Sequence, residues 1–259
     1  ALWLVVGIAY TGGNWTNGDR RMDFVRLSGE LFIYYTLIAL GGGVFVAFTL
    51  FIFDAIGLDV EWFVQGWLLP CGAAGAVIVA AGLVEAQEGA TVNMAVVLTR
   101  LFTPLFAVVL VVFLATMMWT SGTIDVEREV LIGFDLLLVL VLGLLLYAVS
   151  ARDPKAPPNA FDVLQLSLVI AALVVDLVAL AAITARISEF GFSPNKAAAL
   201  GENVVLLVNL SWSAWIYTHF LRRRGSFAAL ECWQTRYLPV YSVWAGLVVL
   251  AFPPLFGFV

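Results

Sequence analysis

The stretch VLQLSLVIAALVVDLVALAAITA, residues 163–185, decides the fold class of this chain. It is long enough to cross a lipid bilayer, because about 20 apolar residues in a helix span the hydrocarbon core. Asp176 is the only ionisable side chain within it. A carboxyl at the centre of such a span costs on the order of several kcal/mol unless it is protonated, paired or hydrated. The stretch therefore predicts a membrane protein with a polar feature inside the lipid.

Composition supports the same class and excludes several others. The chain is 63% hydrophobic and 12% charged, whereas soluble domains carry about a quarter charged residues. A net charge of −5 without a long basic run argues against a nucleic-acid partner. The sequence has no P-loop, dinucleotide-binding or zinc-protease motif. Cys71 falls in a predicted span and Cys232 in a predicted loop, and His219 stands alone, so we expect no disulfide, metal or other cofactor.

Seven apolar stretches of span length predict an all-α, polytopic transmembrane bundle with short loops. They cover about residues 28–53, 62–84, 100–120, 130–150, 163–186, 198–221 and 238–257. Residues 28–259 would form this membrane domain. Residues 1–27 begin with the short apolar run ALWLVVGIAY and continue as a polar linker. We interpret them as the tail of a truncated or earlier span.

The positions of Lys and Arg predict the orientation of the spans, because cytoplasmic loops carry an excess of both. Ten of the 13 fall on one predicted side: Arg20, Arg21, Arg26, Arg100, Arg152, Lys155, Arg222, Arg223, Arg224 and Arg236. We therefore expect the Arg222–Arg224 loop in the cytoplasm and the C-terminus outside it. Trp233, Tyr237, Tyr241 and Trp244 cluster near the cytoplasmic start of the last span. Such rings typically anchor a helix at the interface.

Polar residues inside the spans are the candidate site. Spans 163–186 and 198–221 are predicted to form an antiparallel hairpin, which places Asp176 level with Asn209. Glu202 lies about one turn inside the loop end of this hairpin, on the same helix face as Asn209. Asp135 lies about one turn inside the span at 130–150. These four residues outline a polar pathway from the outer side.

Two interpretations of Asp176 stay open. In the functional one, desolvation disfavours the charged carboxylate, so Asp176 exchanges protons near neutral pH as relay carboxyls do in transporters. In the structural one, Asp176 and Asn209 share a hydrogen bond that holds their two helices together. Such bonds contribute on the order of 1 kcal/mol in membranes.

The loop of this hairpin reads RISEFGFSPNK, residues 186–196. It resembles the motif R-I-x-E-[YF]-G-[ILF]-[ST]-x-[NE]-[RK] of a family of bacterial polytopic inner-membrane proteins. That family carries a domain of unknown function, and its members are often described as permease-like. The resemblance covers about residues 96–259 and implies a multi-pass protein of the bacterial inner membrane. The motif positions are occupied by Arg186, Glu189, Gly191, Ser193, Pro194, Asn195 and Lys196.

The motif also predicts a turn with a defined backbone conformation. Gly191 can adopt a positive φ, and Ser193-Pro194 suits a helix N-cap followed by the first helical residue. Lys196 stands where arginine is commoner in the motif, which weakens bidentate anion binding at that position. The turn is either a rigid re-entry point or an outer gate over Glu202 and Asp176.

Three functions fit these features. The first is a permease-like protein that moves a small solute, coupled to protons through Asp176. The second is an accessory or assembly protein that packs against other membrane subunits or a second copy, with Asp176 bonded to Asn209. The third, ranked last, is a membrane-embedded enzyme acting on lipid. It would have few candidate catalytic residues: Asp135, Glu189 and Glu202. We expect a lipid bilayer around the chain and no enzymatic activity.

Overall fold

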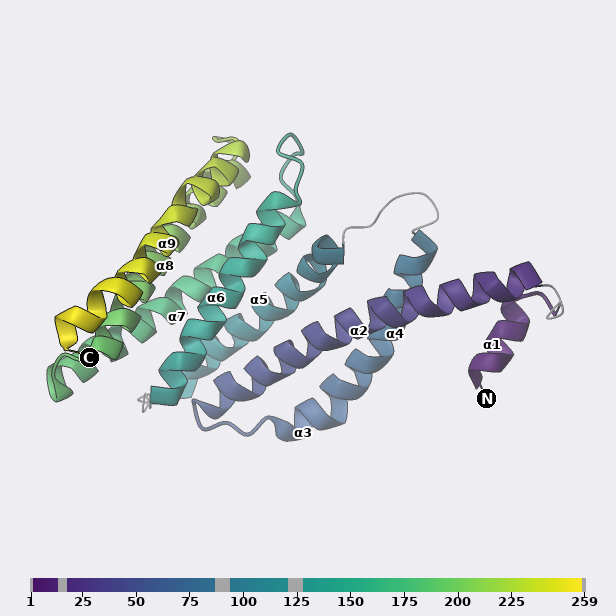
Figure 1. The fold of residues 1–259 in the computed structure, drawn as a ribbon, viewed down its shortest axis with the longest axis horizontal. Coiled ribbons are helices and arrows are strands. Elements are labelled where there is room, and N and C mark those ends of the chain that lie inside the picture. The colour runs from purple at the N-terminus through teal and green to yellow at the C-terminus, as the bar shows by residue number, and fades with distance from the viewer. Residues whose placement is uncertain (1, 14–17, 87–93, 121–127, 258–259) are drawn as a thin grey trace. The chain divides into compact units, whose positions relative to one another are not determined.

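The computed structural model describes residues 2–13, 18–86, 94–120 and 128–257 (Figure 1). These residues form helices and turns, without a strand in the described ranges. Seven of the described helical segments are long and apolar enough to cross a membrane. The predicted all-α, polytopic helix bundle is therefore confirmed.

Each predicted span coincides with helical structure, but several helices are longer than the spans. The helices are α1 (Leu2–Tyr10), α2 (Gly18–Asp54), α3 (Glu61–Phe63), the π-helical turn η1 (Val64–Leu68), α4 (Leu69–Ala86), α5 (Met94–Thr120), α6 (Arg128–Ser150), α7 (Ala160–Phe190), α8 (Pro194–Leu221) and α9 (Ala228–Phe256). Helices α2 and α9 begin before their predicted spans. Polar residues mark the end of an apolar span, but they do not end a helix. For the same reason Cys232, predicted in a loop, lies in α9.

The chain divides into two compact units. The first comprises the described residues of 1–47 and 61–98, with α1, most of α2, and α3 to α4. Helix α1 packs on the start of α2, where Trp3 Nε1 donates to Ser28 Oγ at 3.1 Å. Arg20 Nη1 also donates to the carbonyl oxygen of Thr11 at 2.7 Å. The predicted linker thus includes the polar first turns of a helix.

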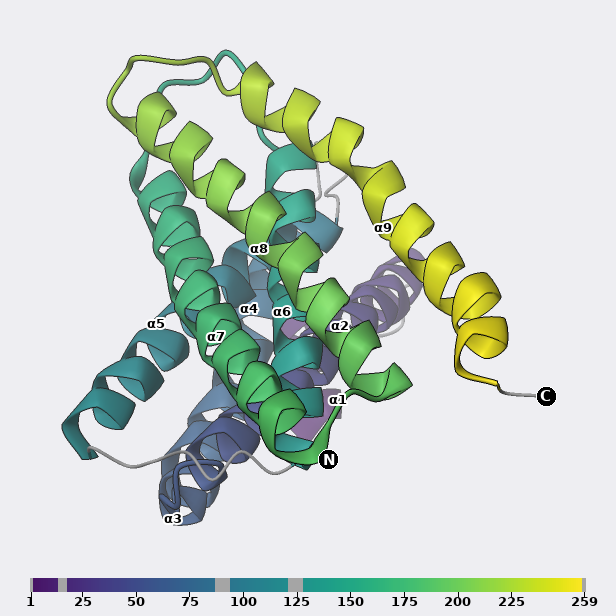
Figure 2. The same ribbon diagram turned by 90° about the vertical axis from the view of Figure 1, so that its left-hand side faces the viewer.

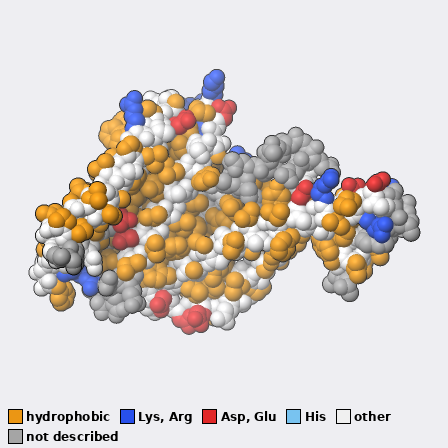
Figure 3. All heavy atoms as spheres, in the orientation of Figure 1, with side chains coloured by type: hydrophobic (Ala, Val, Ile, Leu, Met, Phe, Trp, Pro, Cys, Tyr) orange, Lys and Arg blue, Asp and Glu red, His pale blue; other side chains and the backbone are white. Residues whose placement is uncertain are grey.

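The second unit comprises residues 48–60 and the described part of 99–259, and it contains all the candidate site residues. Helices α6, α7, α8 and α9 follow one another as antiparallel neighbours (Figures 1 and 2). Hydrophobic side chains spread along their flanks, and Lys and Arg side chains gather near their ends (Figure 3). The core consists of aromatic and aliphatic side chains with under 2% exposure, among them Phe113, Phe134, Leu138, Leu168, Leu206 and Leu210.

Helix α7 forms the centre of this unit, and local sequence signals fix both of its ends. Asn159 is the N-cap, and its side chain forms a reciprocal capping box with Asp162. Gly191 ends the helix with φ 74°, a conformation that favours glycine. Between these ends, α7 buries one long face that includes Gln165 and Asp176. The helix therefore carries polar side chains into the core of the unit.

Candidate functional site

Asp176 lies in the middle of α7, about 21 Å from the Phe190 end at 1.5 Å per residue. Its side chain is completely buried, and neither carboxylate oxygen has a hydrogen-bond partner among the described residues. Buried polar atoms in proteins are normally paired with another protein group, a water molecule or an ion. The arrangement requires a proton, a cation or water at Asp176.

Asp135 of α6 has a partner that the sequence analysis missed. Asn203 Nδ2 of α8 donates to Asp135 Oδ1 at 2.7 Å and to the carbonyl oxygen of Ala199 at 2.9 Å. The side chain of Asn203 is fully buried, and its Oδ1 has no partner in the described part of the chain. The sequence does contain a signal for Asn203, because it is a polar amide inside a predicted span. It lies directly after Glu202, the residue that the sequence analysis selected. A second unsatisfied acceptor thus lies beside Asp135.

The acidic residues of this unit form one electrostatic group. Asp176 and Glu202 each lie within electrostatic range of Asp135. Asp135 and Glu202 are partly exposed, whereas Asp176 is buried. The structure therefore brings together three of the four predicted site residues, with Asp176 as the innermost.

A pocket of about 310 Å³ opens between α6, α7 and the start of α8. Its lining combines the predicted turn with Asp135: the residues are Leu131, Ile132, Asp135, Ile183, Arg186, Ser193, Asn195, Lys196 and Ala199. Asp176 does not line this pocket. Polar access from this end of the bundle therefore extends to Asp135, within electrostatic range of the buried carboxyl.

The predicted turn chemistry is confirmed. Gly191 has a positive φ, Ser193 is the extended N-cap of α8, and Pro194 is its first residue. Lys196 Nζ donates to the carbonyl oxygens of Arg186 at 3.0 Å and Gly191 at 2.9 Å. These carbonyls belong to the last turn of α7 and its cap, so the ammonium stabilises the negative end of that helix.

The remaining motif residues differ in their position. Arg186 is half-buried and lines the pocket, and Asn195 is exposed and also lines it. Glu189 is exposed and is not part of the lining. The motif thus contributes one arginine, one lysine and two neutral polar side chains to the pocket.

The predicted hydrogen bond between Asp176 and Asn209 is wrong. Asn209 Nδ2 donates to Tyr241 Oη at 2.7 Å and to Gln234 Oε1 at 3.1 Å, both on α9. Trp233 Nε1 donates to Asn209 Oδ1 at 2.7 Å. The side chain of Asn209 thus bonds to α9 instead of α7. Two residues interpreted as interfacial anchors, Trp233 and Tyr241, are therefore also part of a polar network.

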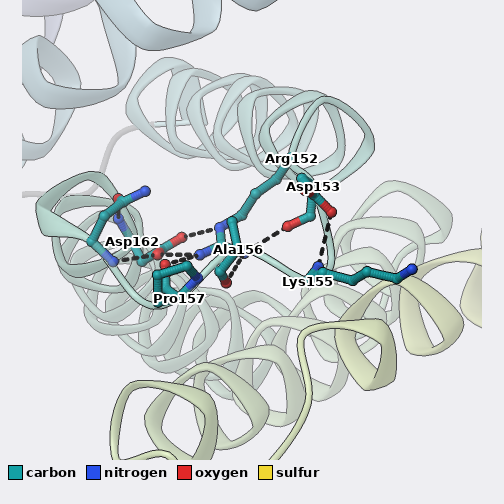
Figure 4. Close-up of polar contacts among 7 residues, drawn as sticks. Arg152, Asp153, Lys155, Ala156, Pro157 and Asp162 are labelled. Atoms are coloured by element: carbon teal, nitrogen blue, oxygen red, sulfur yellow. Dashed lines mark hydrogen bonds and ion pairs between the residues drawn. The ribbon is translucent and has the colours of Figure 1, made fainter.

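Sequence reasoning also missed a buried ion pair at the opposite end of the unit. Arg152 lies in the loop between α6 and α7, and it donates from Nε to Asp162 Oδ1 at 2.7 Å and from Nη2 to Oδ2 at 2.8 Å. Figure 4 shows the guanidinium also reaching the backbone carbonyls of Asp153, Ala156 and Pro157. In the sequence alone, Arg152 indicates only the orientation of the spans.

The surroundings of this ion pair explain its role. The guanidinium carbon of Arg152 lies 4.7 Å from the Phe220 ring centroid and 4.5 Å from that of Phe227. Asp162 also caps its own helix through Asn159. Every nitrogen of the Arg152 guanidinium donates to a protein group. The cluster therefore joins the loop after α6 to the start of α7. It offers no free group for a ligand.

The described residues contain no group of three or more His, Cys, Asp or Glu side chains that could hold a metal ion. The chemistry available at the pocket and at Asp176 is ion pairing, hydrogen bonding and proton transfer. Comparisons of the chain with protein-family models, curated proteins and solved structures found no match.

Proposed function

We propose that this chain is a permease-like protein of the bacterial inner membrane that moves a small solute together with protons. The observation that carries the proposal is the buried carboxyl of Asp176 at the centre of a span-length helix, which has no hydrogen-bond partner among the described residues. Intramembrane carboxyls of this kind are typical of proton relays. The pocket that Asp135 helps to line supplies a place where a solute enters next to this relay.

In this proposal a proton passes between two unequal carboxyls. Asp135 is half-buried, borders the pocket and holds a hydrogen bond from Asn203. Asp176 lies deeper and has no donor among the described residues. Two neighbouring carboxylates repel each other, so a proton on one favours the charged form of the other. Solute binding near Asp135 would therefore change the proton occupancy of Asp176.

The proposed orientation follows from the Lys and Arg distribution. With the Arg222–Arg224 loop in the cytoplasm, the turn at Gly191–Ser193 and the pocket face the outer side. Solute would then enter from outside. Tagging either terminus with a reporter that is active only in the cytoplasm tests this orientation, and a cytoplasmic C-terminus would reverse the proposed direction.

The accessory role has less support than transport. Its sequence-based form required a bond from Asp176 to Asn209, and Asn209 bonds to α9 instead. The lipid-acting enzyme has no metal-binding cluster among the described residues on which to build its chemistry. Neither alternative explains why Asp176 is buried without a donor.

The test is transport by the full chain reconstituted in phosphatidylcholine liposomes. Labelled butyrate, alanine, succinate and glucose are each offered with an inside-alkaline pH gradient. We expect at least one solute to accumulate above its level in protein-free liposomes, into which butyric acid diffuses by itself. This excess should leak out when a protonophore collapses the gradient and should be lost in Asp176→Asn. Glu189→Gln is the matched control, because Glu189 is exposed and outside the pocket. Transport that persists in Asp176→Asn, or that is lost equally in Glu189→Gln, would contradict the proposal.

A further inference from the structure

The pocket at the start of α8 has a composition that selects among solutes. Its charged lining consists of Arg186, Lys196 and Asp135, and Ser193 and Asn195 add neutral polar groups. Its other lining residues are apolar: Leu131, Ile132, Ile183 and Ala199. We propose that this pocket binds a small carboxylate with a short apolar body. The inference rests on the proposed transport function and names its substrate class.

Arg186 is the anchor for the anionic end of this solute. A guanidinium presents a planar fork of donors that matches the two oxygens of a carboxylate. Arg186 lies in the last turns of α7 and is half-buried at the pocket wall. Lys196 adds a positive charge whose position is fixed, because its ammonium donates to the carbonyls of Arg186 and Gly191.

The start of α8 strengthens the preference for an anion. Ser193 is the N-cap, and its side chain makes no capping hydrogen bond. Asn195 and Lys196 belong to the first turn, whose backbone N–H groups point away from the helix toward its N-terminus. A carboxylate beside Ser193 would therefore meet the positive end of the helix as well as two cationic side chains.

Asp135 makes anion binding depend on a proton. Its carboxylate lines the same pocket and would repel a bound anion, since like charges in a poorly solvated site oppose each other. The groups that face it are Asn203 and Glu202 from α8 and Asp176 from α7, with Arg186 and Lys196 across the pocket. A proton taken up by this acidic group would remove the repulsion, so one carboxylate and one proton would bind together.

The volume and the apolar wall limit the body of the solute. Sites for small molecules begin at about 300 Å³, so a pocket of about 310 Å³ suits a short chain. Ile183 and Leu131 are buried side chains that offer an apolar wall on two different helices. Each methylene that enters this wall should tighten binding by up to about fourfold. Affinity should therefore rise from acetate to butyrate and stop rising when the pocket is full.

The test measures equilibrium binding, so that it is independent of transport. The full chain in phosphatidylcholine nanodiscs is titrated with acetate, butyrate and hexanoate, and with butyramide as the neutral analogue of butyrate. We expect butyrate to raise the melting temperature and butyramide to have no effect. Calorimetry in buffers of different ionisation enthalpy should show a proton taken up with butyrate and no uptake in Asp135→Asn.

Three variants locate the site. Arg186→Gln should weaken butyrate binding by roughly tenfold or more, because a charge-assisted pair is lost. Arg236→Gln is the matched control, since Arg236 is an exposed α9 residue outside the pocket. Ala199→Phe fills the pocket and should abolish binding while Arg186 is retained. If Arg186→Gln is misfolded by size-exclusion chromatography, the Ala199→Phe result decides the location.

The outcomes separate this inference from the proposed function. Equal binding of butyrate and butyramide, or butyrate binding that survives Ala199→Phe, would overturn the carboxylate site. Stabilisation by phosphatidylglycerol in the nanodisc instead of by butyrate would overturn it in favour of a lipid headgroup. Transport of glucose without butyrate binding would leave the permease proposal intact and overturn the carboxylate inference. Asp176→Asn should still bind butyrate, whereas its transport is expected to fail.

Discussion

Asn203 and Asp135 meet across α6 and α8, where the amide donates to the carboxylate at 2.7 Å. The carboxyl of Asp176, within electrostatic range of this pair, has no comparable donor among the described residues. Two carboxyls of one acidic group therefore have opposite surroundings. One is held in place by an amide at the pocket wall, and the other is buried without a partner. This difference leads to the first prediction.

Asp176→Leu should stabilise the fold while it abolishes transport. A buried polar group without a partner costs about 1–3 kcal/mol, and leucine of similar size removes that cost. We expect the free energy of unfolding in an SDS titration to rise by about that amount. Asp135→Leu is the contrast, because it leaves an Asn203 N–H without its acceptor and should not stabilise. A lower stability of Asp176→Leu would show that Asp176 has a structural partner.

The ion pair of Arg152 and Asp162 should be a major contributor to stability. Both side chains are at most 10% exposed, and removing one member leaves an uncompensated buried charge. Such a loss costs about 3–5 kcal/mol. Asp162→Asn should therefore lower the free energy of unfolding by about that amount, and the double variant Arg152→Met/Asp162→Leu should recover part of it. Lys155→Gln, in the same loop but exposed, is the control. Equal stability of Asp162→Asn and Lys155→Gln would contradict this role.

The polar network around Asn209 should hold α9 to α8. Trp233, Gln234 and Tyr241 each share a hydrogen bond with the Asn209 side chain. Asn209→Leu should therefore destabilise the chain by about 1–3 kcal/mol, because three partners, of which Gln234 is buried, lose their bonds. A double-mutant cycle with Tyr241→Phe checks the assignment, since the two changes should be less than additive. Strict additivity would mean that the two residues do not interact. A double-mutant cycle of Asn209→Leu with Asp176→Asn should be close to additive, because these two side chains share no hydrogen bond.

Gly201 should be sensitive to the size of its replacement. A Cβ at this position would overlap the ring of Trp244, so glycine permits the close approach of α8 and α9 there. Gly201→Val should destabilise by about 1–3 kcal/mol through overpacking. Gly201→Val combined with Trp244→Ala should relieve the clash and restore part of the stability. Gly143, on α6 with open space at its Cβ position, is the matched control for Gly→Val. The order of thermal unfolding temperatures of these variants checks the contact.

Several features of the chain were predictable because their causes are local. The seven spans follow from runs of apolar residues, and each coincides with helical structure. The turn before α8 follows from the backbone preferences of Gly191, Ser193 and Pro194. Residue type and spacing along the chain are sufficient for each of these properties.

The partners of the polar residues were decided only by tertiary structure. Neighbouring residues on a helix point about 100° apart, so helix rotation determines which neighbouring helix a side chain faces. That rotation turns Asn209 toward α9 and leaves Asp176 without a donor from any described residue. It also brings Asn203, instead of the adjacent Glu202, to Asp135. The sequence by itself determined a membrane bundle with a carboxyl inside it, because hydrophobic length is a local property. Packing of distant helices decided that this carboxyl finds no hydrogen-bond partner in the described part of the chain.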